Sequence, residues 1–452
     1  MMRQNDEFID RTINPNISMV GEMPANSADA KVNTLLFNNV LNSQISKDLK
    51  STLRYRYYDN DNDTPEIFWP QYNQEDAASV ALRRRNLAYS YTKQNASEEL
   101  TWRADKNLTV GGSVGWEQYD RDRRAVDVTN EFIGKVFLDA RIGEDTRLRS
   151  SYQYSERTFE NYDFASVAYY QYNGVGTNVT SLLMRQLDLA DRDRQKANVS
   201  LEWSGIERLT ITPTAGLRFD SYDTNPDNIY PNIGQGNAGE LGLTKDNTWN
   251  VGIEVAYSFS PGTTLMLAYV HENFDRDLYS GQGVTNYLTP TTTGPNPARY
   301  FFSNMDENVD TYIASANIEL IPDTLELKLN YAYAHGKENW SAQPYTNSSD
   351  CLAAVNSACQ PFPAMKTDYQ RLDAVLKYRV DPEFVTKVGL IGDVFVKLRY
   401  SWEQNQVTNW QNDWTTPYMY LVDGSMVRNI AMAAVNPNYT SHLIAASLAV
   451  KW

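Results

Sequence analysis

Apolar and polar residues alternate with a period of two along many segments of this 452-residue chain. In segment 325–333 the odd-numbered positions are Leu or Tyr, whereas the even-numbered positions are Glu, Lys, Asn and Ala. Successive side chains of a β-strand point to opposite faces, so this pattern predicts strands with one apolar and one polar face. The same pattern recurs at 49–57, 148–154, 197–203, 209–219, 249–259, 372–380 and 394–402.

The connections between these segments are of two kinds. Short ones carry the Gly, Pro, Asp and Ser residues that favour turns. They lie at 46–48, 143–145, 204–208, 260–262 and 321–324. Long polar stretches lie between the hairpins, at 59–84, 156–195, 220–247, 275–308, 337–369 and 403–439. The spacing of the turns predicts about fifteen strands of about ten residues each, with short turns and long loops in strict alternation.

This alternation distinguishes two all-β architectures. A soluble sandwich has loops of similar length at both ends and few loops longer than about a dozen residues. An outer-membrane barrel has short periplasmic turns and long extracellular loops, with aromatic girdles at both membrane surfaces. The chain contains 30 Tyr, 15 Phe and 10 Trp, many of them near the ends of the expected strands. We therefore predict an all-β fold, a transmembrane antiparallel β-barrel of the bacterial outer membrane.

The C-terminal segment indicates the orientation of the strands. Its apolar face ends on Trp452, which resembles the terminal signal strand that the outer-membrane assembly machinery recognises. A last strand that runs toward the periplasm makes the short turns periplasmic and the long loops extracellular.

The strand count indicates how much of a barrel is present. Single-chain bacterial barrels have even strand numbers, so an odd count indicates either a poorly patterned strand in 8–23 or the C-terminal portion of a larger barrel. We expect the larger barrel, and the absence of an apolar leader after Met1 agrees with it. Residues 1–31 would then be an N-terminal loop segment, the remnant of a truncated barrel, and residues 32–452 would carry the strands.

Composition excludes several functions. A net charge of −15 and an isoelectric point near 4.8 argue against nucleic-acid binding, which needs a clustered basic surface. The chain has two Cys and no Cys-x-x-Cys-His motif, so it attaches no haem covalently and has no thiolate zinc site. Strand parity nevertheless places many cations on the expected lumen face. The strongest contact candidates among them are Arg54, Arg56, Arg147, Arg149, Lys397 and Arg399.

A basic lumen has three interpretations. It could select anions, contact an acidic occupant, or form structural ion pairs and hydrogen bonds with water. Fewer acidic residues share the lumen face, so the loops must carry the acidic excess. These inward acids are Asp139, Glu202, Glu254, Glu326 and Asp373.

Other candidate sites are weaker. Asp59, Asp61 and Asp63 resemble a calcium loop, but Thr64 and Pro70 stand where an EF-hand needs Gly and Glu. A solvated acidic loop is therefore favoured, with loose calcium binding still possible. We expect Cys351 and Cys359 to form a loop disulfide in an oxidising compartment. The three histidines (His271, His335 and His442) lie far apart and form no catalytic set, so we expect no enzyme activity and no cofactor of its own.

Segment 53–65, Leu-Arg-Tyr-Arg-Tyr-Tyr-Asp-Asn-Asp-Asn-Asp-Thr-Pro, resembles the MtrB/PioB family of decahaem-associated outer-membrane proteins. Segment 23–31 resembles the loop that precedes this hairpin in the family, and the hairpin architecture is similar over nearly the whole chain. The resemblance implies a barrel of about 26 strands. It further implies a periplasmic multihaem c-type cytochrome in the lumen and an extracellular multihaem cytochrome docked outside, with the haem carried by these partners.

Barrel width separates two candidate functions. With strands about 4.8 Å apart and tilted by about 40°, about 26 strands give a circle about 50 Å across, whereas about 16 strands give about 30 Å. The wider barrel could hold a cytochrome. The sequence and the resemblance thus favour the porin-like sheath of a porin–cytochrome conduit. The sheath would contact outer-membrane lipid, and the conduit as a whole would transfer electrons across the membrane. The alternative is a general or anion-preferring diffusion porin or transporter.

Overall fold

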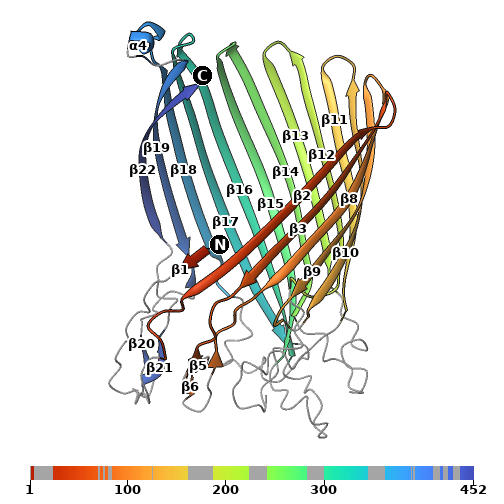
Figure 1. Ribbon diagram of the computed structural model, residues 1–452, viewed down its shortest axis with the longest axis vertical. Coiled ribbons are helices and arrows are strands. Elements are labelled where there is room, and N and C mark those ends of the chain that lie inside the picture. The colour runs from red at the N-terminus through yellow and green to blue at the C-terminus, as the bar shows by residue number, and fades with distance from the viewer. Residues whose placement is uncertain are drawn as a thin grey trace.

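The computed structural model describes residues 2–4, 24–69, 72–74, 77–79, 84–124, 126–160, 187–222, 242–281, 300–344, 362–387, 389, 392–410, 418–420, 426–430 and 438–451. Most of these residues belong to one antiparallel sheet, which contains 16 strands. Figure 1 shows the strands side by side, in the order of the chain.

Fifteen of the strands are long, in agreement with the number expected from the turn spacing. They are β2 (Ala30–Gln44), β3 (Leu49–Asn62), β8 (Tyr91–Asp105), β9 (Leu108–Arg121), β10 (Val128–Ile142), β11 (Thr146–Phe159), β12 (Arg192–Ile206), β13 (Leu209–Ser221), β14 (Gly242–Ser260), β15 (Thr263–Gly281), β16 (Tyr300–Ile321), β17 (Leu325–Pro344), β18 (Met365–Arg379), β19 (Asp393–Thr408) and β22 (Tyr439–Lys451). Each pairs with its neighbours in the chain, so the sheet is a simple meander.

The two ends of the sheet differ. Short turns join the strands at one end, which we call the turn end and which lies at the top of Figure 1. The opposite end, which we call the loop end, carries the longer connections. Three two-stranded hairpins lie in these connections: β4 (Phe68–Trp69) with β7 (Arg84–Arg85), β5 (Tyr72–Gln74) with β6 (Ala77–Ser79), and β20 (Tyr418–Tyr420) with β21 (Met426–Ile430).

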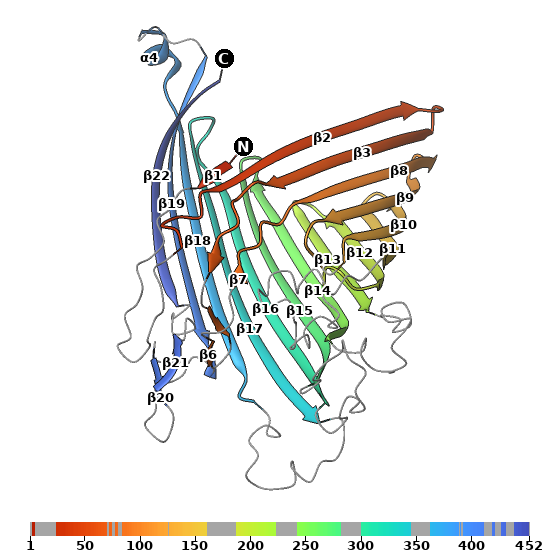
Figure 2. The ribbon, with the colours of Figure 1, turned by 60° about the horizontal axis from the view of Figure 1, so that its bottom comes forward.

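The sheet does not close on itself. Its last strand, β22, pairs only with β19 among the described residues. At the other edge, the three-residue strand β1 (Met2–Gln4) covers only residues 30–32 of β2. The rest of β2 pairs with β3 alone. Figure 2 shows the curvature of the sheet between these two edges.

Two details differ from the sequence expectation. The strands are 13 to 22 residues long, so they enter the stretches expected to be loops, such as 275–308 and 337–369. Backbone pairing continues beyond the apolar belt because it needs no apolar side chain. Strand β1 lies inside the expected N-terminal loop 1–31, and β2 begins at Ala30. The proposed strand at 8–23 lies outside the described residues.

A short helix, α4 (Pro382–Lys387), occupies the connection between β18 and β19 and was not predicted. The Asp381 carboxylate accepts a hydrogen bond from the backbone N–H of Glu383 at 2.8 Å, and Pro382 needs no partner for its nitrogen at the first helical position. Among the described residues, no helix is long and apolar enough to cross a membrane.

The alternation along each strand divides the sheet into two faces. On β14 the outer face carries Trp249, Val251, Ile253, Tyr257 and Phe259, which are 38 to 54% exposed. Trp249 and Tyr257 are separated by about 27 Å along the strand, or about 21 Å across a membrane for a tilt of about 40°. This span is close to the apolar band of outer-membrane barrels, about 25 Å tall and flanked by aromatic girdles. The opposite, polar face is called the inner face below.

Candidate functional site on the inner face

From β3 to β22, the pairing register places inward-pointing residues of each strand opposite inward-pointing residues of the next, so the inner face is continuous. Irregularities occur near strand ends, for example at 203–206 and 243–245, and leave the parity of the strand centres unchanged. All six contact candidates lie on this face: Arg54, Arg56, Arg147, Arg149, Lys397 and Arg399. The five inward acids expected from parity lie there too.

The structure does not bring the six cations together. They lie in pairs on β3, β11 and β19, which are far apart in the order of strands. Within each strand they lie near the turn end or at mid-strand. They therefore form a distributed charged wall rather than one compact site.

Four of the six are compensated by carboxylates. Arg147 donates two hydrogen bonds to Asp139, at 2.8 and 2.6 Å. Arg149 lies 3.7 Å from the same carboxylate. Arg399 donates to Asp373 at 2.6 Å, and Arg54 lies 3.9 Å from Glu99.

Arg56 and Lys397 form no ion pair with a carboxylate of the described residues. The same holds for four further inner cations: Lys50, Lys135, Arg141 and Lys196. These side chains leave positive charge on the inner wall that the described part of the chain does not neutralise. The wall can therefore attract an acidic occupant or small anions.

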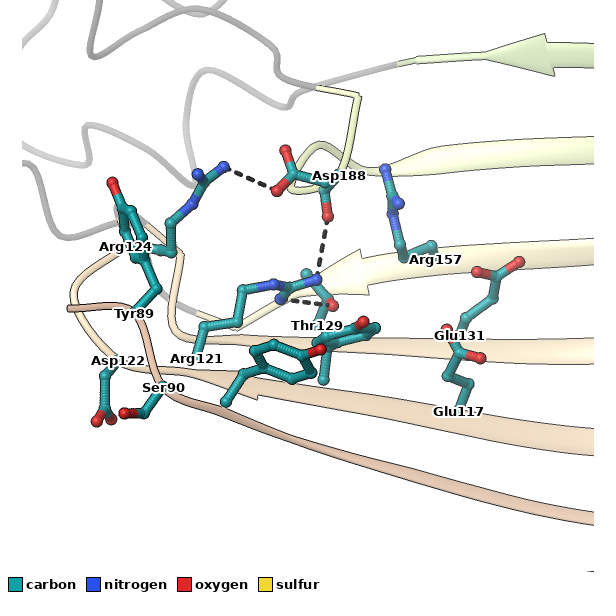
Figure 3. A pocket seen from close by; sticks show the side chains of 12 residues that line it. Tyr89, Ser90, Glu117, Arg121, Asp122, Arg124, Thr129, Glu131, Arg157 and Asp188 are labelled. Atoms are coloured by element: carbon teal, nitrogen blue, oxygen red, sulfur yellow. Dashed lines mark hydrogen bonds and ion pairs between the residues drawn. The ribbon is translucent and has the colours of Figure 1, made fainter. Parts of the chain in front are cut away.

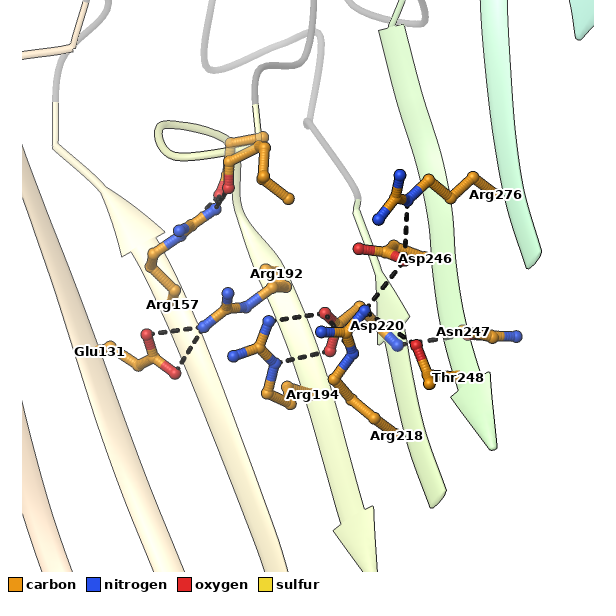
Figure 4. Close-up of polar contacts among 12 residues, drawn as sticks. Glu131, Arg157, Arg192, Arg194, Arg218, Asp220, Asp246, Asn247, Thr248 and Arg276 are labelled. Atoms are coloured by element: carbon orange, nitrogen blue, oxygen red, sulfur yellow. Dashed lines mark hydrogen bonds and ion pairs between the residues drawn. The ribbon is translucent and has the colours of Figure 1, made fainter. Parts of the chain in front are cut away.

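A different arrangement occurs at the loop end, where Figure 4 shows a continuous series of ion pairs across neighbouring strands. Asp220 accepts two hydrogen bonds from Arg194, both at 2.6 Å, and lies 3.5 Å from Arg218. Arg218 continues to Asp246 at 3.0 Å, which also accepts from Arg276 at 3.2 Å. We call these five residues the rim ladder.

The two carboxylates of the rim ladder are buried, whereas its three arginines are partly exposed. Asp220 is 1% exposed and Asp246 is 4% exposed. Beside it, Arg192 donates to both oxygens of Glu131, at 2.7 and 2.8 Å, and is itself buried. Segment 187–191 follows the wall here, because Arg157 donates to the carbonyl oxygens of residues 187 and 190 at 2.7 Å. Arg192 and Arg194 lie in the stretch 156–195 that the sequence predicted to be a loop.

Next to the ladder lies a pocket of about 320 Å³, drawn in Figure 3. The Tyr119 ring lies between two cations, with Lys93 at 4.7 Å and Arg121 at 4.3 Å from its centre. Arg121 also donates to the Thr129 hydroxyl at 3.0 Å and to the Asp188 carbonyl at 3.2 Å. The hydrogen bonds to Thr129 and Asp188 already satisfy Arg121. The bond to the Asp188 carbonyl helps to anchor the 187–191 segment. The sequence alone did not indicate this pocket, since its residues come from the ends of four strands and from three connections.

The other predicted sites have different outcomes. Asp59 and Asp61 lie within β3 on the outer face, where extended backbone keeps neighbouring carboxylates apart. Asp63 is held by Lys31 at 2.5 Å and Asn33 at 3.0 Å, and the Lys31 ammonium lowers its pKa below the ordinary 3.8. No three His, Cys, Asp or Glu residues of the described chain form a group able to hold a metal ion. The calcium candidate is therefore not assembled in this structure.

The remaining candidates are the cysteines and histidines. Cys351 and Cys359 lie outside the described residues. His271 and His335 each contact an Asp, at 2.9 and 2.8 Å, and His442 lies 3.0 Å from the Tyr400 hydroxyl. All three lie on the outer face, away from the charged wall.

Among solved structures, the chain is similar in outline to large outer-membrane transporters. It matches the transporter YddB of Escherichia coli with a TM-score of 0.39 and 10% identity, over 83% of this chain and 55% of that one. It matches the FrpB iron transporter of Neisseria meningitidis with a TM-score of 0.41 and 8% identity, over 84% and 61%.

Comparisons of sequence identify the family more specifically than comparisons of structure do. The chain is 25% identical to outer membrane protein MtrB of Shewanella baltica (strain OS185) over 319 residues, and this match covers 70% of the chain. The match spans only 41% of that protein's length. The family described as "putative outer membrane beta-barrel porin, MtrB/PioB" matches residues 1–452. An all-β meander with an apolar outer face and a charged inner face is the architecture that this description requires, and the chain therefore belongs to the MtrB/PioB family of outer-membrane β-barrel porins.

Proposed function

We propose that this porin-like outer-membrane chain forms part of the sheath of a porin–cytochrome conduit. The sheath would enclose a periplasmic multihaem c-type cytochrome, dock an extracellular one, and insulate their haems from lipid while electrons cross the membrane. The chain's own residues would hold and align the occupant and would perform no redox chemistry. Membership in the MtrB/PioB family supports this proposal.

The observation that carries the proposal is the open sheet. Fifteen long strands leave two edges without partners among the described residues, along β22 and along most of β2. Each unpaired backbone group costs several kcal/mol in hydrocarbon, so both edges need partner strands, and we propose that further strands supply them. A barrel of about 26 strands would be about 50 Å across, which is wide enough for a folded cytochrome.

The inner wall supplies the chemistry of attachment. Arg56 and Lys397 have no carboxylate partner among the described residues, and they project from opposite parts of the sheet. A cytochrome with an acidic surface would supply the missing negative charge. Several such contacts around the wall would hold the occupant centrally without a single high-affinity site.

Purification from native outer membranes tests the proposal directly. The protein should copurify with a partner that stains for covalent haem, and the assembly in liposomes should reduce an enclosed dye when a donor is supplied outside. A haem-free protein that conducts ions through an open pore would contradict the proposal. A neighbouring gene for a multihaem cytochrome is expected as well.

The second candidate is an anion-preferring diffusion porin, which the same uncompensated cations favour. It predicts a steady conductance with a reversal potential set by the anion gradient. Charge reversal at Arg56 and Lys397 should then change ion selectivity, whereas the sheath proposal predicts loss of a bound protein.

A further inference from the structure

Three ordered rows of polar side chains cross the outer face of β15 to β18, toward the loop end. The first row, nearest the apolar belt, is aromatic, and ring centres are 5.1 Å apart between Tyr269 and Tyr312 and 6.2 Å apart between Tyr312 and Tyr333. The second row alternates His and Asp: His271, Asp310, His335 and Asp368 are successive cross-strand neighbours. The third row consists of Asn273, Asn308, Lys337 and Lys366.

The first two rows contain the same unit twice. Tyr269 and His271 both contact Asp310, at 2.7 and 2.9 Å. Two strands further, Tyr333 and His335 both contact Asp368, at 2.7 and 2.8 Å. Each carboxylate is thus already engaged by a hydroxyl and an imidazole.

The third row distinguishes the two units. On the loop-end side of the first unit, the Asn273 amide donates to Asn308 at 3.1 Å and to Asp306 at 3.0 Å, so these side chains satisfy one another. On the loop-end side of the second unit, Lys337 and Lys366 are direct cross-strand partners, and both are exposed. Neither ammonium lies within ion-pair distance of a described carboxylate. Like charges directly opposite each other are destabilising, so an anion bound between the two side chains would stabilise this pair.

The position of the pair indicates the anion. Lys366 is twelve residues from Tyr378, the aromatic residue at the turn end of β18. That separation is about 41 Å along the strand, or about 31 Å across the membrane, against a belt about 25 Å tall. The lysines therefore lie a few ångströms beyond the apolar belt, where their stems can follow the sheet and their ammonium groups reach the headgroups.

We propose that Lys337 and Lys366 form a binding site for a phosphorylated headgroup of a lipid in the external leaflet. The loop end faces outward if the short turns are periplasmic, as is general for outer-membrane barrels. The phosphate would lie between the two ammonium groups, and the acyl chains would run down the outer face past Tyr333. The His335–Asp368 pair below would keep the carboxylate away from the lysines, so that the positive charge remains available to the phosphate.

Native mass spectrometry of the protein purified from outer membranes and delipidated in detergent tests this site. Diphosphorylated lipid A should bind, and the double variant K337Q/K366Q should bind it about 30-fold more weakly, from about a fivefold contribution of each lysine near an anionic surface. K337R/K366R should retain binding. The same lipid without its phosphates should bind wild type as weakly as diphosphorylated lipid A binds K337Q/K366Q.

A matched control is available on the same face. Lys245 is already held by Asp275 at 2.7 Å and Asp277 at 3.0 Å, so K245Q should leave lipid binding unchanged. Unchanged affinity of K337Q/K366Q would overturn the proposal. Inorganic phosphate that saturates the site at the same concentration as the lipid would show a free-phosphate site instead and would also overturn it. Heat-modifiable migration on gels checks that each variant is assembled.

Discussion

The two ends of the inner wall carry similar residues in different surroundings. At the loop end, Asp220 has a fully buried side chain between Arg194 and Arg218. Toward the turn end, Asp139 also lies between two arginines, but its side chain is 31% exposed and those of Arg147 and Arg149 are 39 and 46% exposed. Water reaches all three side chains of the second set, whereas in the first set it reaches the arginines but not the carboxylate.

This difference separates structural charge from charge available for recognition. Removing the buried carboxylate leaves partly buried arginines with fewer hydrogen-bond acceptors, whereas removing the exposed one leaves cations that water solvates more fully. The rim ladder is therefore expected to hold strands β12 to β15 together. The exposed wall keeps cations that an occupant can reach.

The largest expected effect concerns Asp220. Asp220→Asn keeps the shape of the side chain but removes the anion that Arg194 and Arg218 share. The free energy of unfolding should fall by about 1.5–3 kcal/mol, as for lost hydrogen bonds to a charged group, because both arginines are partly exposed and Arg218 keeps Asp246 as a partner. Urea denaturation in detergent measures it.

The matched variant is Asp139→Asn at the exposed end. It should cost no more than about 1 kcal/mol, because exposed pairs contribute little. Equal losses in the two variants would show that the two ends do not differ in the way proposed here.

The second prediction addresses recognition. Arg56→Glu combined with Lys397→Glu reverses two cations that have no acidic partner in the described chain. Retention of the cytochrome during purification should fall at least tenfold, corresponding to about 1.4 kcal/mol or more, while barrel assembly stays intact. The control is Lys106→Glu in an exposed turn, which should leave retention unchanged. Normal retention in the double variant would remove these residues from the contact surface.

Salt should separate the two ends with a smaller effect. The screening length falls from about 10 Å at 0.1 M salt to about 3 Å at 1 M, and buried pairs are screened much less than exposed ones. High salt should therefore release part of the bound cytochrome but leave the Asp220→Asn destabilisation almost unchanged. A strong salt dependence of that destabilisation would indicate that the ladder is hydrated.

The sequence predicted the sheet well because its period survives almost everywhere. Arg54, Arg147 and Lys397 lie on three distant strands, yet parity alone placed them on one face. Side-chain direction depends only on the two-residue repeat, and the bulges lie near strand ends.

The limits of the strands could not be predicted in the same way. Arg192 and Arg194 fell in an expected loop because their neighbours are polar on both faces, beyond the apolar belt. The cross-strand pair of Arg194 and Asp220 was the available signal, but it requires knowledge of which strands pair. The pocket around Tyr119 likewise depends on segment 187–191, which is distant in sequence.

The smallest predicted effect is a pH dependence at an exposed pair of the loop end. Lys31 lowers the pKa of Asp63 below 3.8, so the folded state binds this proton less readily than the unfolded state. The contribution of the pair is therefore present above pH 3.8 and is lost as the pH falls through the folded pKa. The Asp63 amide donates to the Lys31 carbonyl at 2.9 Å, so hydrogen exchange in this hairpin reports the change. After correction for intrinsic rates, protection should stay constant above about pH 5 and drop as the pH falls below about 4 in wild type, and it should remain flatter in Asp63→Asn. If both proteins gave the same profile, the local stability of this hairpin would be independent of the Lys31–Asp63 contact.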